Sequence, residues 1–157
     1  MSISKQDTAL IFQVLNEIGI ISQLSAAQFG KVLAPDLNMS EFGVLNHFVR
    51  VGGAKSPSRL ARIFQMSKPS MTAILAKLSA KNYVVITASK EDRRRKIVTI
   101  TKAGKAARAR GISAVAPRLA EIEAGFDSKA LAQVLPTLAA LREFLDTARE
   151  VEDNLKH

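Results

Sequence analysis

The chain has 157 residues, enough for one domain or two closely packed lobes, and contains no cysteine. The absence of cysteine excludes disulfides, thiolate nucleophiles, sulfur-ligated zinc and thiol redox sensing. No apolar run approaches the ~20 residues that a membrane helix needs, and the N-terminus lacks the pattern of a secretion signal. The sequence therefore predicts a soluble, cytoplasmic protein without membrane contact.

The net charge of +9 is concentrated in the middle of the chain. Residues 50–110 carry +14, whereas residues 1–49 carry −2 and residues 111–157 carry −3. A basic segment between mildly acidic flanks is typical of a protein that binds a polyanion. A solvated basic surface would also explain the charge. A membrane surface fits less well, because the basic residues do not lie on one amphipathic helix.

Two helices are expected before the basic segment. Residues 6–33 place apolar side chains three and four apart, on a stripe wider than one neighbouring helix needs. Pro35 marks the end of this helix. A second helix is expected to begin with Ser40 as its N-cap and to end at Gly52-Gly53. Its inner face is predicted to consist of Phe42, Leu45, Phe48 and Val49.

Two short helices joined by a tight turn at Gln65-Met66 are predicted next. Ser56 is expected to cap the first and Ser67 the second, with a proline in the first turn of each. The second helix has one apolar face, formed by Met71, Ile74, Leu75 and Leu78. Its other face consists of Lys68, Ser70, Thr72, Ala73 and Lys77. These side chains are mostly small and none is glutamate, which suits close approach to base edges. Asn82 is expected to end the helix in a left-handed conformation.

Residues 83–88 and 96–101 are β-branched runs that predict a hairpin of two short strands. The tip, residues 90–96, carries five basic side chains around one acidic pair. Such a tip can reach phosphates or the minor groove, beside a major groove occupied by the helix. The stretch from Ser56 to Gly104 is therefore predicted to be a helix-turn-helix with a wing, and duplex DNA is its leading candidate ligand.

Two more helices are expected after the hairpin. Thr101 should cap the first, which starts basic and contains Pro117, a residue expected to kink or interrupt it. A break at residues 126–128 precedes a last helix with leucines at helical spacing. Within that helix, Pro136 predicts either a bend or a later start.

With these elements placed, nearly the whole chain resembles the MarR family of bacterial transcriptional regulators. The resemblance rests on SRLARIFQMSKPSMTAILAKLSAKNYV, which is similar to the family's helix-turn-helix. It also rests on Asp92-Arg93-Arg94 followed by KIVTITKAG, which matches the family's wing signature. The Asp-x-Arg pattern is uninformative alone, but at this distance from a capped recognition helix it is specific.

The resemblance implies a mostly α fold with a small β wing (α+β). Residues 36–105 would form the winged helix-turn-helix lobe, and residues 1–35 and 106–157 the helical dimerisation region. It implies an obligate homodimer in which each winged lobe faces one half of a pseudo-palindromic operator. The regulator is most often a repressor, and the half-sites would lie about one helical turn, roughly 10 bp, apart.

The resemblance also implies roles for individual residues. The residues of the recognition helix that would face the major groove are Ser67, Lys68, Ser70, Thr72 and Ala73, with Lys77 further along the same face. Arg94 would enter the minor groove, and Asp92 would orient the wing through a charge-assisted hydrogen bond. The other basic residues of the tip, Lys90, Arg93, Arg95 and Lys96, would contact phosphates or stay solvated. Many relatives have arginine in place of Ala73, so the wing is expected to carry more of the binding here.

The alternatives to a DNA-binding regulator are an interaction module and an enzyme. A winged helix can serve as a protein–protein or RNA interaction module, but the +14 segment and the glutamate-free face favour DNA. An enzyme would need a catalytic triad, a metal cluster or a phosphate-binding glycine loop. None of these can be assembled from a sequence with two histidines, so neither a cofactor nor a metal is expected.

Relatives in the family often bind small aromatic or phenolic effectors in a crevice between the helical base and the winged lobe. In this chain the candidates for such a site are Phe42, His47 and Arg50, together with the start of the fifth helix. A histidine in such a helix is more often a structural or solvated residue than a ligand contact, and this also applies to His47. A ligand would act by shifting the separation of the two recognition helices.

Overall fold

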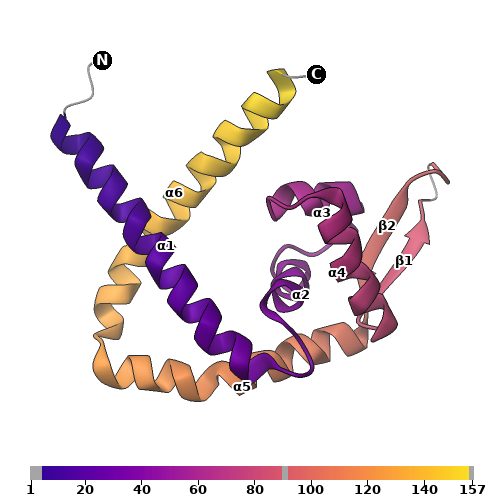
Figure 1. The fold of residues 1–157 in the computed structure, drawn as a ribbon, viewed down its shortest axis with the longest axis horizontal. Helices are drawn as coiled ribbons and strands as arrows, with labels where there is room; N and C mark the ends of the chain where they lie inside the picture. The colour runs from indigo at the N-terminus through magenta and orange to yellow at the C-terminus, as the bar shows by residue number, and fades with distance from the viewer. Residues whose placement is uncertain (1–4, 90–91, 156–157) are drawn as a thin grey trace. The chain divides into compact units, whose positions relative to one another are not determined.

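The computed structural model describes residues 5–89 and 92–155 (Figure 1). Within these ranges the chain forms helices and one antiparallel hairpin, which confirms the prediction of a mostly α fold with a small β wing. The elements in order are α1 (Lys5–Leu33), α2 (Met39–Val51), α3 (Pro57–Ile63), α4 (Lys68–Ala80), β1 (Val84–Ala88), β2 (Lys96–Ile100), α5 (Lys102–Gly125) and α6 (Ser128–Leu155). The chain forms two compact units, and the boundary between them lies between Arg118 and Leu119.

The core of the first unit is shared by α2, α3, α4 and the hairpin. Its fully buried large side chains are Val44, Leu45, Leu60, Met71, Leu75, Leu78, Val84 and Val98. The predicted inner face of α2 is partly right, since Leu45 and Phe48 are buried. Val49 is 41% exposed, however, and Val44, which sequence reasoning did not place inside, is fully buried. The buried stripe of α2 is thus rotated by about one position from the predicted one.

The predicted N-cap of α2, Ser40, is wrong, because the residue that caps this helix is Asn38. The Asn38 side chain accepts a hydrogen bond from the backbone N–H of Glu41, 2.8 Å away, and the Glu41 carboxylate accepts one from the backbone N–H of Asn38. This reciprocal pair is a capping box, which satisfies two backbone donors at once. Ser40 has no residue at the spacing that would complete such a pair, so the helix begins two residues earlier than expected.

The caps of the helix-turn-helix agree with the prediction. The Ser56 and Ser67 hydroxyls accept hydrogen bonds from the backbone N–H groups of Arg59 and Ser70, each at 3.2 Å. After α4, Asn82 has φ = 57°, the left-handed conformation that was expected. Gln65, in the turn between α3 and α4, also has a positive φ of 53°, and no residue type there signalled it.

The hairpin pairs Val84 with Ile100 and Ala88 with Lys96, so each strand is one residue shorter than predicted. The strand β2 also forms backbone hydrogen bonds with a residue outside the hairpin. The backbone of Lys55 exchanges two hydrogen bonds with Val98, at 3.1 and 2.8 Å. This bridge attaches the wing directly to the segment that leads into α3.

The two long C-terminal helices both tolerate an internal proline. The Thr101 hydroxyl accepts a hydrogen bond of 2.9 Å from the backbone N–H of Gly104, so Thr101 caps α5 as predicted. However, α5 continues through Pro117 to Gly125, and the predicted interruption does not occur. The break at residues 126–128 lies where it was expected, but α6 begins at Ser128 and contains Pro136, so a later start is wrong.

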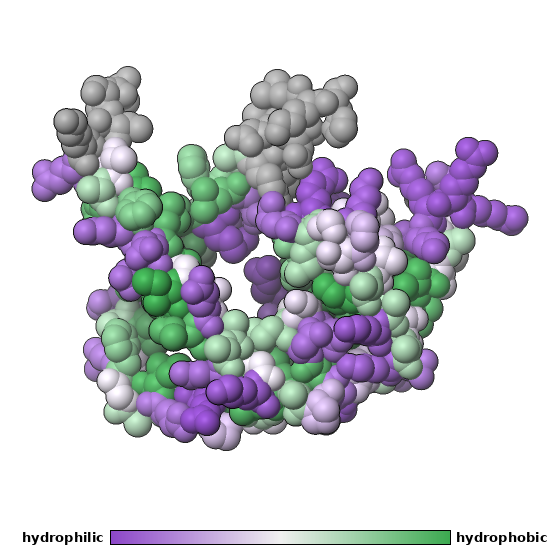
Figure 2. All heavy atoms as spheres, viewed as in Figure 1, coloured by the Kyte–Doolittle hydropathy of each residue, from purple (hydrophilic) through white to green (hydrophobic). Residues whose placement is uncertain are grey.

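The helix α1 exposes most of its apolar stripe. Leu10, Phe12, Ile21 and Leu24 are each between 59% and 71% exposed, and hydrophobic side chains gather over α1 in Figure 2. By length and composition, residues Gln6–Leu33 could cross a membrane, contrary to the expectation that no apolar run is long enough. The same composition arises in a soluble helix whose wide apolar stripe packs against other protein surfaces.

Candidate nucleic-acid interface

The helix α4 is held by one face and presents the other. Met71, Leu75 and Leu78 are buried beneath it. The residues expected to contact DNA are all exposed on the outer side or at the N-terminal cap: Ser67, Lys68, Ser70, Thr72, Ala73 and Lys77. Burial of one stripe therefore fixes the rotation of α4 about its axis, and with it the direction of these six side chains.

The hydroxyl groups of this face are already oriented by bonds within α4. The Ser67 and Ser70 hydroxyls lie 2.7 Å apart, and the Thr72 hydroxyl donates to the backbone carbonyl of Lys68 at 2.8 Å. A hydroxyl has one donor and two acceptor positions. The Thr72 hydroxyl donates its proton within the helix, so its oxygen can still accept a hydrogen bond from a base amino group. The exposed methyl group of Ala73 can make an apolar contact with the methyl group of thymine.

The tip of the wing is organised by Asp92. Its Oδ1 accepts a hydrogen bond of 3.0 Å from the backbone N–H of Arg94, and its backbone carbonyl accepts one of 2.9 Å from Arg95. Its Oδ2 lies 3.5 Å from Nε of Arg95. Arg93, Arg94, Arg95 and Lys96 are all exposed. Lys90, which was also expected to contact DNA, lies outside the described residues.

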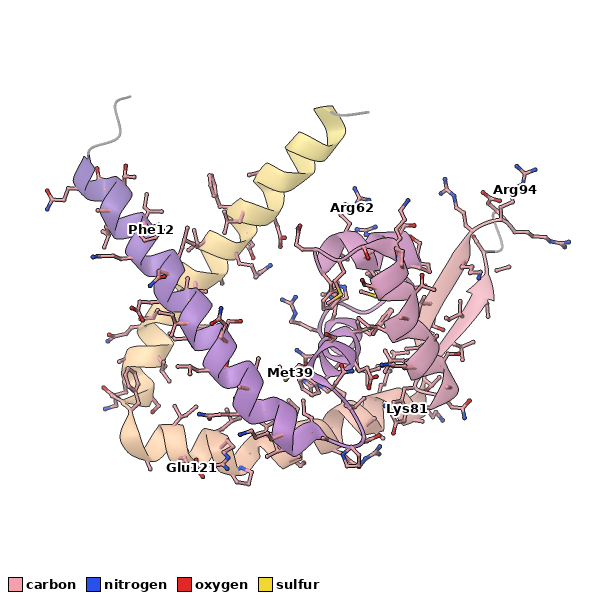
Figure 3. The ribbon with its side chains drawn as sticks, viewed as in Figure 1. Phe12, Met39, Arg62, Lys81, Arg94 and Glu121 are labelled. Atoms are coloured by element: carbon pink, nitrogen blue, oxygen red, sulfur yellow. The ribbon has the colours of Figure 1, made fainter. Side chains whose placement is uncertain are left out.

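The wing tip and the helix-turn-helix present basic side chains on a common side. Figure 3 shows Arg62 of α3 and Arg94 of the wing projecting from the same side of the winged part. An open groove of about 510 Å³ on the winged part is lined by Ser56, Pro57, Ser58, Arg94, Arg95 and Lys96. Arg59 and Arg62 are exposed on α3. Sequence reasoning placed both outward without assigning them to the interface, although the +14 charge of the segment includes them.

The three residues suggested for an effector site, Phe42, His47 and Arg50, all lie on α2. Phe42, on α2, packs against α5, where a Cβ atom at Gly111 would be 2.9 Å from its ring. His47 is buried and packs edge-on against Phe64, with ring centroids 5.7 Å apart. Arg50 is exposed near the end of α2. Phe42 and His47 thus take part in the packing of two different neighbours of α2.

His47 has an unusual environment for a polar side chain. Its Nε2 atom is buried without a hydrogen-bond partner among the described residues. Burial lowers the pKa of His47, and the nearby cations Lys55, Arg50 and Arg59 lower it further. The ring is therefore neutral at neutral pH and behaves as a core aromatic residue.

These features define a winged helix-turn-helix protein with an exposed basic face. Residues 36–95 match the family model described as "MarR family". That match runs from just before α2 through the helix-turn-helix to Arg95 at the wing tip, so this segment of the chain is similar to the MarR family. No curated protein matches the sequence significantly.

Solved structures confirm the fold over most of the chain. The transcriptional regulator BldR from Sulfolobus solfataricus has a TM-score of 0.72 and 24% identity, covering 92% of this chain and 99% of BldR. A cysteine-to-serine mutant of MarR from E. coli, crystallised with operator DNA, has a TM-score of 0.66 and 21% identity, covering 83% of this chain and 94% of MarR.

Proposed function

We propose that this protein is a sequence-specific DNA-binding transcriptional regulator that binds a pseudo-palindromic operator as a homodimer. The observation that carries the proposal is that α4 is held by its buried stripe with Ser67, Ser70, Thr72 and Ala73 exposed, in the same unit as a wing tip that exposes Arg93, Arg94 and Arg95. A recognition helix and a basic wing that face the same way can engage adjacent grooves of one duplex.

The dimensions of α4 suit the major groove. Its 13 residues span roughly 20 Å at the rise of an α-helix. The major groove is ~12 Å wide and admits one helix when its side chains are small. Ser67, Ser70 and Ala73 keep the N-terminal half of α4 narrow, so its backbone can approach the base edges. Arg94, at the end of the wing, is then free to reach the minor groove beside it.

The long helices α1 and α6 provide the surface for a homodimer. Each exposes large apolar side chains along its length, which monomeric soluble proteins rarely leave in such numbers on one face. On α1 they are Leu10, Ile11, Phe12, Val14, Leu15, Ile18, Ile20, Ile21 and Leu24. On α6 they are Leu131, Val134, Leu135, Leu138, Phe144 and Leu145. We therefore assign residues 36–105 to the DNA-binding lobe, and residues 1–35 and 106–157 to the dimerisation region.

A second copy of the chain is the partner that a two-fold symmetric DNA site calls for, since operator symmetry mirrors protein symmetry. One polypeptide has a mass of 17.0 kDa. Light scattering after gel filtration should give twice that mass, in keeping with a cytoplasmic, soluble regulator. A mass of one chain at micromolar concentration would contradict the dimer.

The regulator is proposed to act as a repressor that releases its operator on binding a small aromatic or phenolic effector. This part rests on the family resemblance, because Phe42 and His47 pack against different neighbours of α2. The shift would act on the distance between the two recognition helices. An operator titration with and without salicylate-like acids tests it: a fixed operator affinity in the presence of every such compound would remove the effector from the proposal.

The experiment that tests DNA recognition is a selection of bound sequences from a random duplex library. The full-length protein should recover a two-fold symmetric motif with half-sites about one helical turn apart. Recovery of no motif, with binding that depends only on salt, would show that the basic face binds DNA without reading its sequence.

A further inference from the structure

Three side chains from distant parts of the chain meet beside the wing. The Tyr83 hydroxyl donates a hydrogen bond of 2.6 Å to Oδ1 of Asp36. The Arg110 Nη2 atom lies 3.0 Å from the second oxygen of the same carboxylate and 3.1 Å from the Tyr83 hydroxyl. Each member of this cluster, which we call the joint, therefore contacts both others.

The three residues of the joint lie where the winged lobe connects to the long helices. Asp36 lies in the connection between α1 and α2, where the first long helix passes into the winged lobe. Arg110 lies on α5, which leads out of the winged lobe. Tyr83 follows the recognition helix α4 and directly precedes β1. Both chain crossings between the winged lobe and the long helices are thus tied to one tyrosine hydroxyl.

Neighbouring contacts stiffen this region around the end of α4. The Lys81 ammonium donates to the Asp36 backbone carbonyl and forms a 2.9 Å ion pair with the buried carboxylate of Glu41. The Tyr83 backbone carbonyl accepts a hydrogen bond of 3.1 Å from the backbone N–H of Thr101. The residues that directly follow α4 are therefore connected to the start of α2 and to the start of α5.

The joint has the chemistry of a directional contact. The hydrogen bond from Tyr83 and the neighbouring Arg110 lower the pKa of Asp36, so the carboxylate stays charged and accepts from both donors. The same carboxylate raises the pKa of Tyr83, which keeps its hydroxyl proton as the donor. Hydrogen bonds to a charged acceptor are shorter and more selective in geometry than neutral ones.

We propose that Asp36, Tyr83 and Arg110 are positioning residues that fix the spacing of the two DNA half-sites which the dimer accepts. This inference rests on the proposed function as a dimeric regulator. In a two-fold dimer, the separation of the recognition helices depends on how each winged lobe is held on its long helices. One added base pair moves a half-site by about 3.4 Å and turns it by roughly 35°. A stiff joint excludes that shift, and a loosened joint permits it.

The test compares duplexes that differ only in half-site spacing. The wild-type protein first selects its preferred site from a random duplex library. Affinity is then measured for that site and for versions with the centre one base pair longer or shorter. The variants are Tyr83→Phe, which removes one oxygen atom, and Arg110→Ala. Lys105→Ala is the matched control, because it removes one positive charge from an exposed position on the same helix.

The wild-type protein should prefer its best spacing by about fivefold or more, the usual lower range of coupling between linked sites. In Tyr83→Phe and Arg110→Ala this ratio should fall toward one while the half-site sequence stays the same. Arg110→Lys, which keeps a donor near Asp36, should regain part of the ratio. Lys105→Ala should keep the wild-type ratio, even where its affinity is lower at every spacing.

A spacing ratio that is unchanged in Tyr83→Phe and Arg110→Ala would overturn the inference, including the case in which affinity falls equally at all spacings. That second pattern would make the joint a contributor to stability only. Failure of the proposed function is distinguishable, because the wild-type protein would then select no two-fold motif at all. Thermal melting of Tyr83→Phe, which retains the ring, checks that the variant is folded in the same assay.

Discussion

The backbone N–H of Arg94 donates a 3.0 Å hydrogen bond to the carboxylate of Asp92, two residues earlier in the wing. This bond closes a local turn of the kind that aspartate favours. It fixes the backbone from which the Arg94 side chain extends, so less conformational entropy is lost when that side chain becomes ordered in a groove. Asp92, the acidic residue in this basic tip, thus fixes the backbone position of Arg94.

Arg94→Ala should weaken binding to the selected duplex by about 1–3 kcal/mol, the scale of one good contact to nucleic acid. The physical reason is the loss of an exposed guanidinium that we propose enters the minor groove. Fluorescence anisotropy at fixed salt measures the effect. Lys129→Ala on α6 removes an equal charge far along the chain and should bind normally. An unchanged affinity for Arg94→Ala would remove this residue from the interface.

Lys96→Ala should lower the salt dependence of binding and leave the preferred sequence unchanged. A lysine that neutralises one phosphate contributes about 0.9 to the slope of log affinity against log salt, through release of condensed counterions. The slope is measured for both proteins by titrations between about 50 and 200 mM salt, a range over which DNA affinity changes strongly. A changed consensus in the selected DNA would show instead that Lys96 reads a base.

Gly104→Ala should destabilise the winged unit by at least about 1–3 kcal/mol, the usual range for overpacking. A Cβ atom there would lie only 2.1 Å from the backbone carbonyl oxygen of Tyr83, which cannot move without disturbing the hairpin. Urea unfolding followed by circular dichroism measures the loss. Gly125→Ala serves as its control, because nothing lies within 4 Å of the added atom. Equal stability of the two variants would refute the close contact.

The stability of the protein should fall as the pH drops below about 6.5, the ordinary pKa of histidine. Burial lowers the pKa of His47 in the folded state, so in this range the unfolded chain binds a proton that the folded chain does not. Linkage then favours unfolding until the pH passes below the folded-state pKa. Urea unfolding at several pH values between neutral and mildly acidic gives the slope. His47→Gln should flatten it, and identical slopes for both proteins would rule His47 out as its source.

Much of the fold follows from local sequence signals. Ser56, Ser67 and Thr101 cap helices because each stands three residues before a backbone N–H that its hydroxyl can reach. Asn82 takes the left-handed conformation that its short polar side chain tolerates. Such features depend on a few neighbouring residues, and a single sequence is enough to predict them. The exposed face of α4 follows in the same way from its buried stripe.

Other features depend on packing between distant segments and have no local signal. Asp36 and Arg110 are 74 positions apart in the joint, and nothing in either segment marks its partner. Val44 is fully buried because α2 is surrounded by neighbours on more than one side, which its spacing alone does not reveal. Pro117 and Pro136 lie inside continuous helices, since tertiary packing can outweigh the local preference of proline. The capping box, by contrast, has a local signal, because Asn38 and Glu41 stand three positions apart.

The central claim is that the α4 face and the wing read DNA sequence. The most direct measurement is a competition titration at physiological salt between the selected duplex and a scrambled duplex of equal length and composition. The account predicts that the selected duplex binds at least about 10³-fold more tightly, the lower bound for specific regulators. Equal affinity for the two duplexes would contradict it and leave only an electrostatic, sequence-independent interaction.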